Sequence, residues 1–219
     1  MDIVEIGGKL GLFYIPFLFA LCFHEYAHGQ VAKWCGDNTA ERAGRLTLNP
    51  LAHADMIGTF ILPISAIVFG IPIFFGWAKP VPVDSRNLKN VRTDMFWIAL
   101  AGPLSNVLLA CIATFIIYCD FRYALFGNNA KYAHALLEMF VLTNLFLAIF
   151  NMIPLNPLDG GKVLARFLPA SINYKLEQHE QMTSWILLIL MFSGALSVLR
   201  IPVYAVFNHL MGLANSGVL

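Results

Sequence analysis

Residues 10–35 read LGLFYIPFLFALCFHEYAHGQVAKWC, and this apolar run decides the class of fold. A helix needs about 20 residues to cross a bilayer, so the run predicts a membrane-spanning helix. Its unusual feature is a polar stretch in its second half, where His24, Glu25 and His28 fall within five residues. Ionisable side chains at membrane depth are costly and usually functional. The run therefore predicts a membrane helix that carries a site.

The composition of the whole chain agrees with a membrane protein. Of the 219 residues, 58% are hydrophobic and 12% are charged, whereas soluble domains carry about 25% charged residues. A formal net charge of +1 argues against a nucleic-acid binder, which would normally show a basic face. The four cysteines form no C-x-x-C pair, so neither a disulfide framework nor a cysteine zinc site is predicted.

The remaining apolar runs predict an all-α polytopic membrane protein with a single domain, residues 1–219. We expect spans at about 10–35, 95–119, 132–154 and 184–199, and a C-terminal helix at about 202–213. The run 57–76 is interrupted by Pro63, Gly70 and Pro72. It is therefore expected to be either a short kinked span or a re-entrant segment.

The basic residues favour the re-entrant alternative for 57–76. If this run returns to its side of entry, one face of the membrane holds nine basic residues: Arg42, Arg45, Lys79, Arg86, Lys89, Arg92, Lys162, Arg166 and Lys175. The other face then holds three: Lys9, Arg122 and Lys131. The positive-inside rule places the nine in the cytoplasm. Re-entrant backbone must be buried in protein or line a wet cavity, so this arrangement also points to a site.

The residues His24-Glu25-x-x-His28 form an H-E-x-x-H pattern. Residues four apart lie one turn along the same helix face, so both imidazoles can reach one tetrahedral Zn²⁺. Glu25 flanks this face and can take a proton from a metal-bound water without being a ligand. The alternative is a pair of helix-packing histidines with a partnered glutamate.

A catalytic zinc needs a third protein ligand and an open position for water. Asp159 is the strongest candidate, because it ends an apolar run and is followed by Gly160-Gly161. The charge-derived topology also places it at the cytoplasmic end of the membrane, where His24 and His28 are expected. His53 and Asp55 precede the re-entrant run and could gate a cavity, bind a second metal, or serve only as loop and capping groups.

Three blocks of sequence together resemble the site-2 protease family of intramembrane zinc metalloproteases. They read HEYAHG at 24–29, AGPLSN at 101–106, and N-x-x-P-x-N-P-L-D-G at 151–160. The blocks occur in the family's order, each on its own hydrophobic segment. No PDZ or CBS module is recognisable, so the chain resembles a compact form of the family.

The resemblance implies roles for particular residues. His24, His28 and Asp159 would bind one Zn²⁺ per chain, with Glu25 as the general base. Asn151 would help to hold the substrate or the oxyanion. Two further positions, Gly102 and Asn106, match the family's G-x-x-x-N pattern and are candidate substrate-binding residues.

Family members are also expected to pair an extended substrate with a membrane-embedded strand. The candidate edge segments here are 44–48 and 77–83, which add a small β-hairpin or re-entrant region to the expected fold. Trp77 and Pro80 are candidate substrate contacts. Proline donates no backbone hydrogen bond, which suits the edge of a sheet better than its interior.

The implied activity is hydrolysis of peptide bonds within or near the transmembrane segments of single-span membrane proteins. The expected location is the lipid bilayer of a prokaryotic plasma membrane, as a multi-pass protein with its site open to the cytoplasm. No nucleic-acid partner is expected, and the oligomeric state stays open.

Two other classes of function fit the sequence less well. A di-iron membrane oxidase needs several histidine clusters, whereas this chain has one pair and four scattered histidines. A transporter or catalytically silent scaffold has no need of Glu25.

Overall fold

The computed structural model describes residues 2–70 and 76–216. The chain begins with α1 (Ile3–Lys9), a π-helical turn (Leu10–Tyr14) and α2 (Ile15–Trp34), which continue one another, followed by α3 (Thr39–Arg42). The middle of the chain forms α4 (Leu62–Phe69), α5 (Val91–Tyr123), α6 (Ala130–Asn151) and α7 (Asp159–Ala165). The last part forms α8 (Ala170–Gln178), α9 (Glu180–Phe192) and α10 (Arg200–Ser216).

Four helical stretches of the described chain are long and apolar enough to cross a membrane. They are Ile3–Trp34, Val91–Tyr123, Gly127–Asn151 and Ala195–Ser216. The chain is mostly helical, and no strand occurs among the described residues. The predicted all-α polytopic class is therefore confirmed, whereas the predicted β-hairpin is not.

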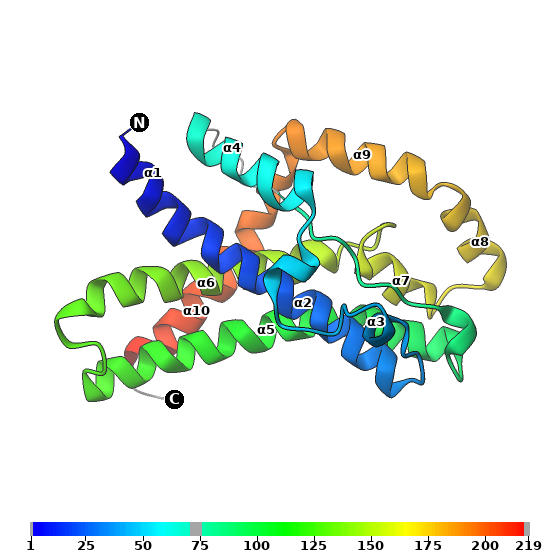
Figure 1. The fold of residues 1–219 in the computed structure, drawn as a ribbon, viewed down its shortest axis with the longest axis horizontal. Coiled ribbons are helices and arrows are strands. Elements are labelled where there is room, and N and C mark those ends of the chain that lie inside the picture. Colours follow the sequence, from blue (N-terminus) through cyan, green and yellow to red (C-terminus); the bar gives the residue numbers. More distant parts are fainter. Residues whose placement is uncertain (1, 71–75, 217–219) are drawn as a thin grey trace.

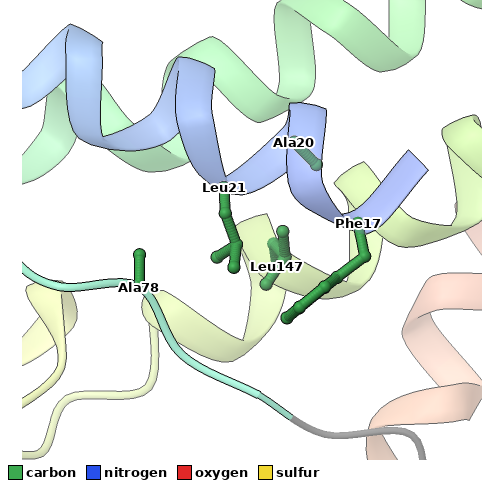
Figure 2. Packing of buried hydrophobic residues seen from close by; sticks show 5 residues of the cluster. All are labelled: Phe17, Ala20, Leu21, Ala78 and Leu147. Atoms are coloured by element: carbon green, nitrogen blue, oxygen red, sulfur yellow. The ribbon is translucent and has the colours of Figure 1, made fainter. Parts of the chain in front are cut away.

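Helices α2, α5 and α6 pack against one another and form the centre of the molecule, with α10 alongside α5 and α6 (Figure 1). On one side of α2, Phe17, Ala20 and Leu21 pack against Leu147 of α6 and Ala78 (Figure 2). A second cluster joins α5, α6 and α10 through the buried residues Ala110, Ala113, Val141, Leu145 and Val203. Small alanines at these contacts let the helices approach closely.

The two ends of the predicted re-entrant run lie together. The run forms a π-helical turn (Met56–Ile61) and α4, which ends at Gly70 in the left-handed conformation that suits glycine. Residues 71–75 lie outside the described residues. The Trp77 N–H then donates to the Gly58 carbonyl at 3.1 Å, and the Thr59 hydroxyl donates to the Trp77 carbonyl at 2.8 Å. A single crossing would separate these ends by the thickness of a bilayer.

The expected pairing of 44–48 with 77–83 is replaced by a different arrangement. The described residues contain one isolated antiparallel bridge, between Ala54 and Ala78. Segment 44–48 forms bends, and it reaches the other segment through the Arg45 guanidinium, which donates to the Lys79 carbonyl at 2.6 Å. The expected strand at 44–48 does not form, and its first residue, Gly44, has a left-handed φ of 67° that a strand does not accommodate.

The C-terminal helices differ from the expected span at 184–199 and helix at 202–213. Helix α9 ends at Phe192, and Gly194 adopts a left-handed conformation with φ of 76°. A 3₁₀ turn (Ala195–Leu199) then runs into α10. The break expected near Pro202 was wrong, because this proline occupies the first turn of α10, where its missing N–H removes no helical hydrogen bond.

Candidate metal centre

Three buried side chains from two helices meet at one point. His24 and His28 project from α2, and Asp159 is the first residue of α7. The two histidine Nε2 atoms lie 3.0 Å apart. The Asp159 Oδ2 atom lies 3.1 Å from His24 Nε2 and 3.3 Å from His28 Nε2. The three predicted ligands are thus brought together, and they form the one cluster of possible metal ligands found among the described residues.

The donor set fits a zinc ion. Ligands at about 2.0–2.2 Å from tetrahedral zinc lie about 3.3–3.5 Å from one another, close to the separations in this triangle. The Asp159 Oδ2 atom is buried and accepts no hydrogen bond from the described residues. An unsatisfied buried carboxylate oxygen is costly, and a cation bound at the triangle would satisfy it.

Hydrogen bonds at the Nδ1 atoms fix the orientation of the two histidine rings. His28 Nδ1 donates to the Ile98 carbonyl at 2.6 Å, and His24 Nδ1 donates to Asn106 Oδ1 at 2.7 Å. Because a carbonyl or amide oxygen accepts at Nδ1, the Nε2 lone pairs are free for a metal. This is the arrangement that supports ligation through Nε2 on both rings.

A buried amide pair holds the Asn106 side chain in place. Its Nδ2 donates to Asn144 Oδ1 at 2.8 Å and to the Ala20 carbonyl at 3.1 Å, which leaves Oδ1 turned toward His24. Asn144 in turn donates to the Phe140 carbonyl. Asn106 is 0% exposed, so the structure places it behind the ligand His24.

Gly102 also lies against the ligands. A Cβ atom at this position would come within 2.5 Å of His28 Nε2 and 2.6 Å of His24 Nε2. Gly102 therefore has a packing role, because only glycine lets α5 approach the histidine face of α2 so closely. The glycines after Asp159 are equally constrained, since a Cβ at Gly160 would lie 2.4 Å from the Ile153 carbonyl oxygen.

The predicted general base faces an extended segment of the chain. Glu25 is 9% exposed, and its Oε2 accepts a hydrogen bond from the Val81 N–H at 2.8 Å. This contact was not predicted, because a backbone N–H carries no sequence signal of its own. The buried Asn144 did carry a sequence signal, because it is an amide within an apolar span.

The metal triangle opens on an apolar cavity of about 1000 Å³. Its wall includes four of the predicted site residues besides the ligands: Glu25, Trp77, Pro80 and Asn151. Asn151 is the last residue of α6, and its Nδ2 donates one N–H to the Leu147 carbonyl at 3.0 Å. An amide carries two such donors, so a second N–H is available to a ligand.

His53 and Asp55 act as loop and capping groups. His53 Nε2 donates to the Thr47 carbonyl at 2.8 Å. Asp55 caps the helical turn that follows it, where its Oδ1 accepts from the N–H groups of Ile57 and Gly58. Neither residue belongs to the metal cluster.

Comparison with known proteins points to the same chemistry. A family model described as Peptidase family M50 matches residues 123–196, which include Asn151 and Asp159. The chain is 35% identical over 179 residues to YwhC of Bacillus subtilis, covering 80% of this chain and 78% of the relative. It is 28% identical over 201 residues to Rip2 of Mycolicibacterium smegmatis, covering 90% and 73%. Both relatives carry the name "Putative zinc metalloprotease". No solved structure matches the chain.

Proposed function

The chain belongs to peptidase family M50, the site-2 protease family, and we propose that it cleaves single-span membrane proteins within or near their transmembrane segments. The observation that carries this proposal is the buried triangle of His24, His28 and Asp159 beside an apolar cavity. A soluble protease would be expected to expose its metal centre in a polar cleft. Here two of the three ligands, His24 and His28, project from a helical stretch that is apolar enough to cross a membrane.

The bound zinc ion would supply Lewis acidity, polarising the scissile carbonyl and lowering the pKa of a bound water toward about 7. The residues of the chain hold the ion, transfer the proton and stabilise the oxyanion. His24, His28 and Asp159 hold the ion, and Glu25 accepts the water proton and later delivers it to the leaving amine. Asn151 lines the cavity, and its second N–H would donate to the developing oxyanion.

The extended segment 77–82 offers an edge for the substrate backbone. Backbone groups alternate in direction along an extended chain, and those of Trp77 and Lys79 are bonded to the neighbouring segments. The groups of Ala78 therefore point the other way, and Ala78 lines the cavity. The Pro80 carbonyl lies 3.4 Å from the Arg45 guanidinium and does not belong to this free edge. This edge could receive an unwound substrate by strand addition.

The proposed orientation opens the site to the cytoplasm of a prokaryotic plasma membrane. The support is the excess of basic residues in 42–92 and 162–175, which the positive-inside rule assigns to that side. Asp159 and the C-terminal half of α2 then lie near the same membrane face. Water could reach the metal centre from there without crossing the bilayer.

The test is cleavage of a generic single-span substrate by the purified wild type and the Glu25→Gln variant, with metal analysis of both. We expect one zinc per chain in each protein and cleavage by the wild type alone. Equal cleavage by the two proteins would contradict the role of Glu25. Two irons per chain and no zinc would favour the oxidase, and zinc without any cleavage would favour a silent scaffold.

A further inference from the structure

The general base is held by a backbone group from a segment far away in the sequence. Glu25 lies in α2, and Val81 lies in the extended segment before α5. The Val81 N–H donates to Glu25 Oε2 at 2.8 Å, and Val81 is 8% exposed. Because both groups are shielded from water, this charge-assisted hydrogen bond is not weakened by competing solvent.

The segment that carries Val81 is anchored so that its N–H must point at the base. The Trp77 and Lys79 backbone groups are bonded on one edge, where the Lys79 N–H donates to the His53 carbonyl at 2.8 Å and Arg45 holds the Lys79 carbonyl. Two residues further along the same edge, Val81 has Glu25 as its acceptor in place of backbone.

The residues on both sides of Val81 are prolines, which carry no backbone donor. Pro80 and Pro82 have no N–H, so Val81 carries the one backbone donor of residues 80–82. Each proline also restricts the residue before it to extended backbone, which keeps the donor in place. The sequence Pro-Val-Pro thus presents a single, rigid N–H to the carboxylate.

We propose that the Val81 N–H is a positioning group for the general base. It occupies Oε2 of Glu25 and restrains the rotation of the carboxylate, so that Oε1 is the oxygen presented to the attacking water. The proposal rests on the proposed protease function. It also means that one segment both offers an edge to the substrate, at Ala78, and orients the base, at Val81.

Kinetics can separate an effect on the general base from an effect on substrate binding. The Val81 N–H is bonded to Glu25 and is therefore not offered to the substrate backbone, so losing it should slow the chemical step and leave substrate binding unchanged. A misplaced base lowers kcat, whereas a damaged substrate edge raises KM.

The experiment compares Val81→Pro with Val81→Ala in the zinc-loaded full chain, using a single-span substrate in detergent micelles. Val81→Pro removes the N–H at a position whose two neighbours, Pro80 and Pro82, are already prolines. Val81→Ala shortens the side chain and keeps the N–H. We expect Val81→Pro to lower kcat at least about tenfold, with KM within about threefold of wild type and zinc content unchanged. Because Val81→Ala keeps the N–H, its kcat should be at least about tenfold higher than that of Val81→Pro. Equal kcat values for the two variants would overturn the proposal.

A second variant covers the case in which Val81→Pro loses zinc or fails to fold. Replacing Val81 by its α-hydroxy acid exchanges the N–H for an ester oxygen and keeps the side chain. The same loss of kcat is expected, and wild-type kcat would overturn the proposal. Cleavage by the wild type and none by Glu25→Gln would leave the protease function standing even then, whereas no cleavage by the wild type would contradict both.

Discussion

At the scale of single residues, the metal centre depends on which nitrogen each histidine presents. The Ile98 carbonyl and the Asn106 amide oxygen each accept from an Nδ1, which leaves both Nε2 atoms facing Asp159. Outer partners of this kind orient metal-binding histidines and raise their basicity. The preorganisation of the site therefore extends beyond the three ligands.

Asn106→Ala is expected to weaken zinc binding by about 10–100-fold, the usual cost of losing such an outer partner. The reason is that His24 loses the acceptor for its Nδ1–H. A chelator competition titration of the purified protein measures the affinity. Ser105→Ala is the matched control on the same helix, because its hydroxyl bonds only to the Gly102 carbonyl among the described contacts. Equal zinc affinity for the two variants would show that Asn106 does not support His24.

At the scale of elements, the site exists because α5 approaches α2 at a glycine. Gly102 faces His24 and His28 with no room for a Cβ. Helix α7 likewise begins with Asp159-Gly160-Gly161, where the glycines let its first turn pack against the preceding loop. Close approach of backbones thus positions all three ligands.

Gly102→Ala is expected to abolish stoichiometric zinc binding, because the added methyl group would occupy space within 2.6 Å of both histidine rings. Metal analysis after purification in zinc-containing buffer measures this. Gly212→Ala is the matched control, since a Cβ at that helical glycine meets nothing within 4 Å. A Gly102→Ala protein with one zinc per chain would contradict the packing argument.

The elements themselves were predictable to different degrees. Long apolar runs such as 95–119 predict helices because a bilayer demands them, and α5 covers that range. The break between the last two helices was misplaced, since Pro202 lies in the first turn of α10 and the helical stretch is interrupted at Gly194 instead. Proline at a helix start and proline at a helix break look alike in one sequence.

At the scale of the whole molecule, Asp37 ties the end of α2 to the loop before α5. This aspartate is 0% exposed and accepts hydrogen bonds from Thr39, Asn87 and the Asp84 N–H. Burial acts to raise the pKa of Asp37, but these hydrogen bonds outweigh burial and hold its pKa below the usual value. The lowered pKa makes this connection a source of stability that depends on pH.

Asp37→Asn is expected to destabilise the fold by about 1–3 kcal/mol at neutral pH, because one buried acceptor becomes a donor. A group with a lowered folded-state pKa stabilises above its unfolded pKa, about 3.9, and loses that effect as the pH falls through the folded value. The difference between wild type and variant should therefore shrink below about pH 4. Denaturation in detergent at pH 7 and pH 3 measures it, and a constant difference would contradict the assignment.

The long-range contacts explain what the sequence could and could not predict about the site. His24 and His28 are four residues apart on one helix, so local geometry is enough to pair them. Asp159 followed from the topology and its position after an apolar run. The contacts of Val81 with Glu25 and of Asn144 with Asn106 cross between segments 56 and 38 residues apart. No local pattern encodes such contacts, because they depend on how the elements pack.

The central claim is that His24, His28 and Asp159 hold a zinc ion. X-ray absorption at the zinc edge, recorded on purified wild type and Asp159→Ala, tests it most directly. We predict only nitrogen and oxygen ligands at about 2.0–2.2 Å in the wild type, and one protein oxygen ligand lost in Asp159→Ala, with weakened zinc binding. Sulfur ligands at about 2.3 Å, or an identical spectrum and affinity for the two proteins, would contradict the account.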